Sequence, residues 1–216
     1  MLSIVIPIYN IHKDIVDLTN RCLKSIKKYT KDYEIIIIDN KNGEQWKKDA
    51  DIYIKNEKNN GNGSAWNQGA MIAKGEYICF MDNDVEVSEN WSEPLIELLQ
   101  NKKIAVAFPL SKNKEDDDYF ERLAGFCWIV RRDIFNEINN NIEKGYRIQD
   151  WNLANFEDTS FFMSCKLKGY ELKCSNQSKI NHYSRATTSK VKEVDELYGK
   201  NEKKYFDKYK ILPLLD

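Results

Sequence analysis

Two aspartates separated by one residue, Asp82 and Asp84, follow the apolar segment 76–81 of this 216-residue chain. Carboxylate oxygens suit Mn²⁺ and Mg²⁺, and phosphate oxygens of a substrate would complete the shell of such an ion. An Asp-x-Asp sequence also arises by chance, and its simplest explanation is then a turn closed by Asx hydrogen bonds. The position at the end of a predicted strand favours a site for a divalent metal ion.

A second pair of acids, Glu157 and Asp158, opens a predicted helix over residues 156–168. The helix dipole stabilises acids at this end of a helix, so the pair could act only as a cap. His182 ends a short apolar segment, where a lone histidine is most often structural. The residue types alone leave the roles of these three side chains open.

An alternation of strands and helices must position these groups. Segments 2–9 and 33–39 are rich in β-branched residues, as buried parallel strands are, and apolar residues recur between them at helical spacing. The alternation predicts an α/β fold with a doubly wound, mostly parallel sheet flanked by helices. The next predicted elements are a strand at 51–54, a polar loop at 56–63, a helix at 64–74 closed by Gly75, and a strand at 76–81.

Beyond residue 90 the predicted elements alternate less regularly. No repeat or linker interrupts the chain, so we expect one domain at residues 1–190 and a helical tail at 191–216. The predicted elements are helices at 91–100, 133–138 and 156–168, the last capped by Gly169, strands at 104–110, 126–131, 170–174 and 179–182, a charged loop at 112–118, and an irregular stretch at 139–155.

Ligands of such a sheet bind beside the carboxyl ends of its parallel strands. These ends carry Tyr9, Asn10, Asp39, Asn40 and the segment 82–84. We therefore expect the functional site at this edge.

Composition excludes several classes of protein. Lys and Arg number 33 against 34 acids, and this balance gives no electrostatic bias toward nucleic acid. No apolar run approaches the roughly 20 residues of a membrane span, and a predicted strand from Leu2 leaves no room for a signal peptide. Five scattered cysteines without a Cys-x-x-Cys pair indicate reduced thiols, so we expect a cytoplasmic protein.

The chain resembles family 2 glycosyltransferases with the GT-A fold, the architecture of nucleotide-diphospho-sugar transferases. No phosphate-binding P-loop or Gly-x-Gly-x-x-Gly fingerprint is present, so the commonest other nucleotide enzymes are excluded. The order and spacing of the matching segments carry the resemblance. These segments are 3–10, 35–40, 60–69, 75–84, 125–132, Glu157-Asp158 and 180–182.

The resemblance implies a nucleotide-binding half at about 1–110 and an acceptor half at about 111–190. The family usually has Asp-Asp-Gly-Ser after its second strand, whereas this chain has Asp39-Asn40 and so lacks the second acid. Glycines near residue 61 would let the backbone approach the nucleotide, or would merely form turns. The implied donor-binding residues are Pro7, Tyr9, Asn10, Asp39, Asn60, Gly61, Asn67, Asp82 and Asn83.

The resemblance also assigns the chemistry. Asp82, Asp84 and His182 would hold Mn²⁺ or Mg²⁺. Asp158 would be the general base that takes the proton of the acceptor hydroxyl, with Glu157 as its substitute.

Two tryptophans and one arginine complete the implied site. Trp128 and Trp151 would present aromatic faces to the acceptor, while Arg185 would neutralise phosphate. The tail mixes apolar and basic residues, which suits peripheral contact with an anionic membrane surface. Its acids dilute the basic face, so we favour a helix docked on its own domain.

The expected activity is inverting, metal-dependent transfer of a single sugar from a nucleotide-diphosphate sugar to a hydroxyl of a glycan, lipid-linked or other acceptor. The Gln-x-x-Arg-Trp motif of processive synthases is absent. Two alternatives stay open. One is a catalytically silent nucleotide-sugar-binding domain, and the other is a nucleotidyltransferase, which would need a Gly/Arg/Lys-rich loop where His12-Lys13 stands.

Overall fold

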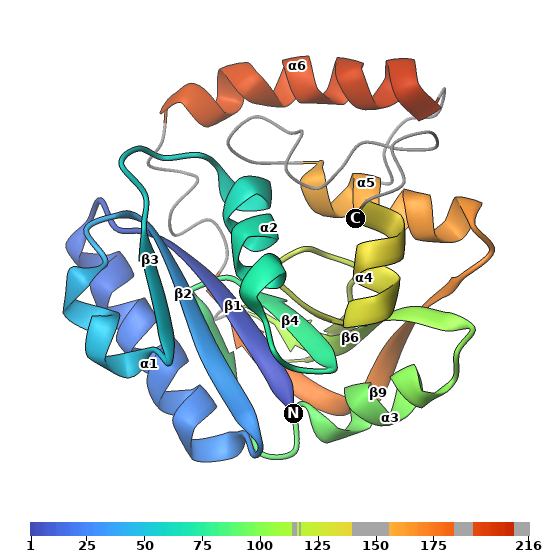
Figure 1. The fold of residues 1–216 in the computed structure, drawn as a ribbon, viewed down its shortest axis with the longest axis horizontal. Coiled ribbons are helices and arrows are strands. Elements are labelled where there is room, and N and C mark those ends of the chain that lie inside the picture. Colours follow the sequence, from blue (N-terminus) through green and yellow to red (C-terminus); the bar gives the residue numbers. More distant parts are fainter. Residues whose placement is uncertain (114–115, 117, 140–155, 184–191, 210–216) are drawn as a thin grey trace.

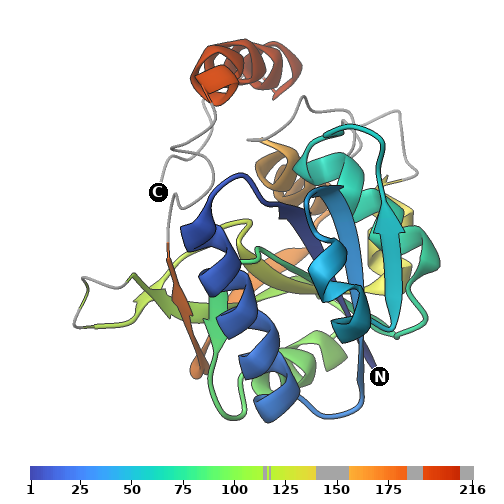
Figure 2. The same ribbon diagram turned by 90° about the vertical axis from the view of Figure 1, so that its left-hand side faces the viewer.

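The computed structural model describes residues 1–113, 116, 118–139, 156–183 and 192–209. A single mixed sheet runs through it, with strand order β3-β2-β1-β4-β8-β6-β9-β5, and β7 pairs with β6 (Figure 1). Helices α1 and α3 and the 3₁₀ helix η1 pack on one face, while α2, α4 and α5 pack on the other, and α1 and α2 lie on opposite sides of the sheet in Figure 2. This is the α/β fold that the sequence predicts.

The first half of the sheet is wholly parallel, as expected from its β-branched strands. Its helix α2 begins two residues before the predicted start, and its C-cap is Ala73, so Gly75 does not cap it. A Cβ at Gly75 would lie 2.8 Å from the backbone nitrogen of Ser3, so the glycine permits close packing on β1. The elements are β1 (Leu2–Tyr9), α1 (Lys13–Tyr29), β2 (Tyr33–Lys41), η1 (Glu44–Asp49), β3 (Ile52–Lys55), α2 (Asn62–Ile72) and β4 (Tyr77–Met81).

The second half is mixed, because β8 runs antiparallel to β4 and to β6, while β9 runs parallel to β6. The two short strands predicted at 170–174 and 179–182 form one strand, β9, whose pairing with β6 shifts register after Pro109. Gly169 closes α5 with φ 86°, as predicted. The elements are β5 (Val85–Val87), α3 (Glu93–Gln100), β6 (Ile104–Lys112), β7 (Phe120–Glu121), β8 (Cys127–Arg131), α4 (Arg132–Asn139), α5 (Glu157–Leu167) and β9 (Glu171–His182).

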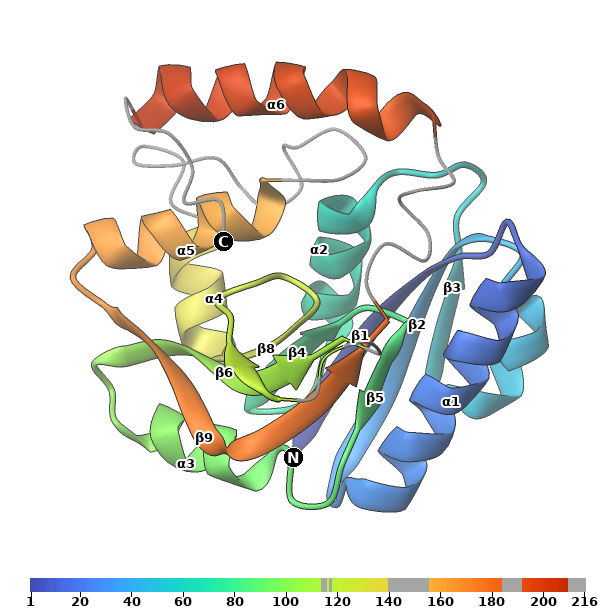
Figure 3. The ribbon, with the colours of Figure 1, turned by 180° about the vertical axis from the view of Figure 1, so that it is seen from behind.

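Apolar side chains fill both faces of the sheet. Trp66 and Trp91 are buried there, and all five cysteines are free thiols, as the sequence predicts. The remaining helix, α6 (Lys192–Tyr209), lies over α5 (Figures 1 and 3), where Tyr205 is fully buried. This agrees with a tail docked on its own domain. Among the described residues, no helix combines the length and apolarity needed to cross a membrane.

Candidate active site

The Asp82–Asp84 turn leaves the sheet between β4 and β5 and is fixed by its backbone. The amide of Asp82 donates to the carbonyl of Phe126 at 2.8 Å, and the amide of Val85 donates back to the carbonyl of Asp82 at 3.3 Å. Beyond the turn, the chain departs from β4 and joins β9 as the short strand β5. The carboxylates of Asp82 and Asp84 therefore lie where the chain leaves the parallel strand β4 and enters β5, which pairs with β9.

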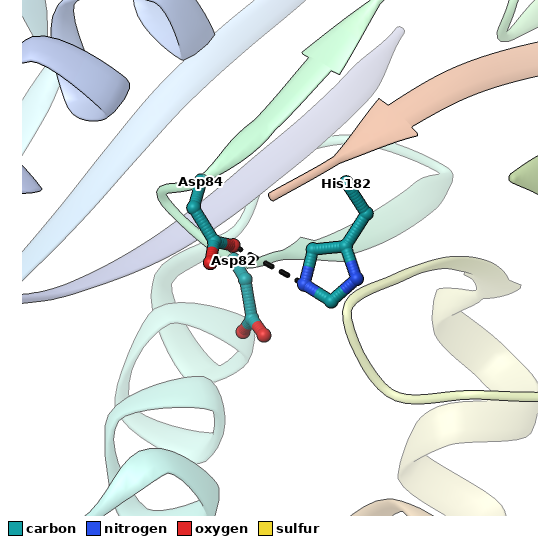
Figure 4. Close-up of side chains that lie close together, drawn as sticks. All are labelled: Asp82, Asp84 and His182. Carbon is teal, nitrogen blue, oxygen red and sulfur yellow. Dashed lines mark ion pairs between the residues drawn. The ribbon is translucent and has the colours of Figure 1, made fainter. Parts of the chain in front are cut away.

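Strand pairing brings His182 to this turn. His182 lies opposite Val85 in the antiparallel pair β5–β9, and the amide of Tyr183 donates to the carbonyl of Asp84 at 3.1 Å. The imidazole Nε2 of His182 lies 3.4 Å from Asp84 Oδ1 (Figure 4). Asp82, Asp84 and His182 each offer one ligand atom, and these three atoms lie within 4.8 Å of one another.

The donor set could hold a divalent cation, because carboxylates suit Mg²⁺ and Mn²⁺ and an imidazole adds preference for a transition-metal ion. Asp84 is 6% exposed, and its buried Oδ1 accepts no hydrogen bond. A buried carboxylate oxygen without a donor is costly unless a cation compensates it. Burial raises the pKa of Asp82 well above its usual range, and the charges of Asp84 and Glu157 raise it further. A bound cation would reverse this electrostatic penalty.

The second acid pair meets the first across Asn62, at the start of α2. The Asn62 side chain lies close enough to both carboxyl groups to lower the pKa of Asp82 and of Glu157, against the larger effect of burial. Burial and the neighbouring charge of Asp158 raise the pKa of Glu157 to about 8. The four acids therefore form one electrostatically coupled group, in which Asp84 and Glu157 are buried and Asp82 and Asp158 are half-buried.

Asp158 is held in one orientation. Its Oδ1 accepts hydrogen bonds from the backbone amide and the hydroxyl of Thr159, at 2.7 and 3.3 Å. Burial raises the pKa of Asp158, and these hydrogen bonds oppose the rise. A Cβ at Gly125 would lie 2.4 Å from Asp158 Oδ2, so only a glycine lets the carboxylate approach this backbone.

Asp39 is buried at the end of β2. Tyr53 donates its hydroxyl proton to Oδ2 at 2.5 Å, while the buried Oδ1 has no hydrogen-bond partner. A Cβ at Gly43 would lie 2.7 Å from the Asp39 carboxyl carbon. This oxygen therefore has unused hydrogen-bonding capacity, and Asp39 itself is 0% exposed.

The predicted residues on β1 border the same edge. Asn10 and Asn42 exchange two side chain–backbone hydrogen bonds of 3.3 and 2.9 Å, and Asn10 Oδ1 is buried without a partner. The half-buried ring of Tyr9 lies 5.8 Å from Lys41 Nζ. Pro7 is buried inside β1 opposite Ile38.

Asn40 replaces the second acid of the family pattern and takes part in a network of amides. Its Nδ2 donates to the carbonyl of Gly61 at 3.4 Å, and its Oδ1 accepts from Asn56 Nδ2 at 2.8 Å. Asn56 and Gln68 in turn exchange hydrogen bonds of 2.9 and 3.0 Å. Gly61 caps α2 with φ 84°, which glycine adopts without strain. The network ties the end of β2 to the helix that carries Asn62.

Other predicted residues have structural contacts. Asn83 donates to Thr19 Oγ1 of α1 at 2.8 Å, and Asn67 accepts from Asn139 at 2.7 Å, so both amides bind other parts of the chain. Asn60 is half-buried in the loop before α2.

The acceptor-binding prediction for Trp128 is wrong. Its side chain is 0% exposed and packs against Phe80 and Phe161, with ring centroids 4.4 and 5.2 Å apart, so it offers no face to a ligand. Trp128 lies on β8, which pairs antiparallel with β4 inside the sheet. Its side chain is covered by the aromatic residues named above. Trp151 and Arg185 lie outside the described residues.

Residues 3–167 match the profile of the family described as Glycosyl transferase family 2. The chain belongs to this family. It is 30% identical over 152 residues to the glycosyltransferase GlyG of Streptococcus pneumoniae, covering 65% of this chain and 49% of GlyG. The chain thus spans about half the length of that relative.

Solved structures show that the fold is GT-A. TarS 1–349 of S. aureus superposes with a TM-score of 0.66 at 16% identity, covering 85% of this chain and 60% of TarS. GalNAc-T7, solved with UDP, GalNAc and Mn²⁺, superposes with a TM-score of 0.67 at 19% identity, covering 86% and 44% of the two chains.

The sequence pattern did not indicate Asn62, Tyr53 and Gly125 as parts of the candidate site. Asn62 stands between two glycines in a loop that was already singled out, so its place at the helix start was a usable signal. Tyr53 occupies the short strand β3 and looks like any strand tyrosine. Its contact with Asp39 emerges only from the register of β2 and β3.

Proposed function

We propose that this glycosyltransferase moves a single sugar from a nucleoside diphosphate to an acceptor hydroxyl with inversion at the anomeric carbon, and that it requires a divalent cation. The observation that carries the proposal is the convergence of Asp82, Asp84 and His182 beside the acid pair of α5. One group of residues would hold the leaving diphosphate, and the other would activate the acceptor.

Asp82, Asp84 and His182 would hold the cation, for which we propose Mn²⁺ or Mg²⁺. The bound ion would neutralise the charge that develops on the departing diphosphate. The buried Asp84 oxygen without a hydrogen bond supports this assignment. The Mn²⁺ and UDP in the GalNAc-T7 structure support it by analogy of fold.

Asp158 would take the proton of the acceptor hydroxyl as that oxygen attacks. A single displacement needs one base and no covalent intermediate, and it inverts the configuration. Because Glu157 keeps its proton to about pH 8, the charge of the adjacent pair resides on Asp158, where Thr159 donates two hydrogen bonds to it. Two neighbouring acids with different environments thus take different protonation states.

The donor nucleotide would lie along the ends of β1 and β2. The unpartnered oxygens of Asp39 and Asn10 would accept hydrogen bonds from its base or ribose. We assign residues 1–110 to donor binding and 111–190 to the acceptor side.

The test is release of nucleoside diphosphate from a panel of nucleotide sugars, with Mn²⁺, with Mg²⁺ and with excess chelator. We expect metal-dependent release by the unmodified protein and none by Asp84→Ala, since water does not restore a lost carboxylate in a preorganised site. Exposed Asp14→Ala is the matched control. Full activity in chelator contradicts the metal assignment. Pyrophosphate release from nucleoside triphosphates would instead identify a nucleotidyltransferase. Tight donor binding without turnover would identify a silent binding domain.

A further inference from the structure

Helix α6, which lies over α5 (Figure 3), contacts the residue that precedes the acid pair of α5. This residue, Phe156, has φ 71°, a left-handed conformation that a bulky side chain adopts only when its surroundings enforce it. Its ring is 5% exposed and packs against Tyr198 and Tyr205, with centroids 5.2 and 5.7 Å apart. Two aromatic rings of α6 therefore hold the strained residue.

A second set of contacts joins the same helices further along. The hydroxyl of Tyr209 lies 2.8 Å from Ser160 Oγ and 3.2 Å from Ser164 Oγ, and it is 3.3 Å from the Ser160 carbonyl. The Tyr209 ring packs on Tyr205 at a centroid distance of 4.7 Å. The contacts thus run from the residue before α5 to its second turn.

Tyr205 lies at the centre of these contacts and near the proposed base. It is fully buried, and it is close enough to Asp158 for that carboxylate to help raise the tyrosine pKa, after burial itself and Tyr209. If Phe156 relaxed to a right-handed conformation, α5 would gain a residue and the chain would enter it along another path. The path by which the chain enters α5 therefore depends on the conformation of Phe156, directly before Glu157 and Asp158.

We propose that α6 is a positioning element of the active site, in which Tyr205 and Tyr209 hold Phe156 in its left-handed conformation and so direct the Asp158 carboxylate toward the acceptor. This inference rests on the proposed role of Asp158 as the base. The residues assigned to the donor belong to β1, β2, the β4–β5 turn, and α2 with the loop before it. Loosening α6 should therefore slow the transfer step and leave donor binding intact.

The experiment compares Tyr205→Ala, which removes the central ring, with Tyr209→Phe, which removes only the hydroxyl. Phe206→Ala is the matched control, since it truncates the neighbouring aromatic residue, which is 43% exposed. We expect kcat to fall at least about tenfold in Tyr205→Ala and about threefold in Tyr209→Phe, with donor KM within about twofold of the unmodified value. Hydrogen exchange at amides 157–160 should accelerate in both, and the control should match the unmodified protein.

A kcat for Tyr205→Ala equal to that of Phe206→Ala would overturn the inference, as would parallel losses of kcat and donor affinity. If Tyr205→Ala does not fold, Tyr209→Phe decides by the same two readouts. An unmodified protein without turnover would refute the proposed function, and the exchange measurement would still decide whether α6 holds the start of α5.

Discussion

The imidazole of His182 lies face to face with the ring of Phe126, with centroids 4.1 Å apart and planes at 22°. This stacking fixes the plane of the imidazole beside Asp84 on a strand whose backbone is already paired with β5. Orientation of a ligating histidine by its neighbours commonly matters 10- to 100-fold for metal affinity. The ring contact between Phe126 and His182 should therefore affect the affinity of the proposed metal site.

His182→Ala should weaken Mn²⁺ binding by tens of fold and leave the fold intact, because β9 is held by backbone pairing. Titration calorimetry with Mn²⁺, together with circular dichroism, measures both effects. The other histidine supplies the control, since His12 is exposed in the loop after β1. If His182→Ala unfolds most of the protein but the remaining folded fraction binds Mn²⁺ with unchanged affinity, then the role of His182 is structural.

Asp158→Asn should keep donor binding and lower turnover by roughly 10² to 10⁴-fold, because the amide preserves size but cannot take a proton. Glu157→Gln should cost much less, since that carboxyl already holds its proton near neutral pH. Helix capping cannot account for such a difference, as it affects only stability, by about 0.3–1 kcal/mol. Steady-state transfer and donor affinity of both variants test the assignment, and a larger loss at Glu157 reverses the two roles.

The metal-free protein should lose stability as pH rises from about 4.5 to about 8. Unfolded Glu157 releases its proton near the lower value, whereas folded Glu157 keeps it to about 8, so the unfolded state binds fewer protons in this window. The cost is on the order of 1.4 kcal/mol per unit of pKa difference. Thermal unfolding in chelator from pH 5 to 8 should show the decline, and Glu157→Gln should make it shallower while the contributions of Asp82 and Asp158, whose pKa values burial also raises, remain. A decline of the same slope in that variant would assign it to other groups.

Asn40→Asp, which restores the acid usual in the family, should lower turnover several-fold. The carboxylate loses the donor to the Gly61 carbonyl and repels that oxygen, so the start of α2 and Asn62 lose their anchor. Asn40→Ala is the control that removes the bond without adding charge, and it should be milder. Unchanged or higher kcat in Asn40→Asp would show that the amide network does not support the site.

The parallel half of the fold was predictable because strong local patterns, such as the β-branched run at 33–39, coincide with its tertiary arrangement. The contact between His182 and Asp84 was implied only by the family resemblance and not by local pattern, since it depends on β5, three residues that carry no pattern of their own. Trp128 shows the same limit. The sequence alone does not distinguish a tryptophan on an exposed strand from one on a covered strand. The distinction requires the position of β8 in the sheet, beside β4 and antiparallel to it.

The pairing of β5 also sets the order in which the site is assembled on the ribosome. Among the described residues, β5 is paired only with β9, and residues 180–182 are synthesised almost a hundred positions after Asp84. A nascent chain can collapse around β1, β2 and β4 while the acidic turn still lacks its partner strand. The cluster of Asp82, Asp84 and His182 would therefore form late in translation, after residues 1–110 have had time to fold.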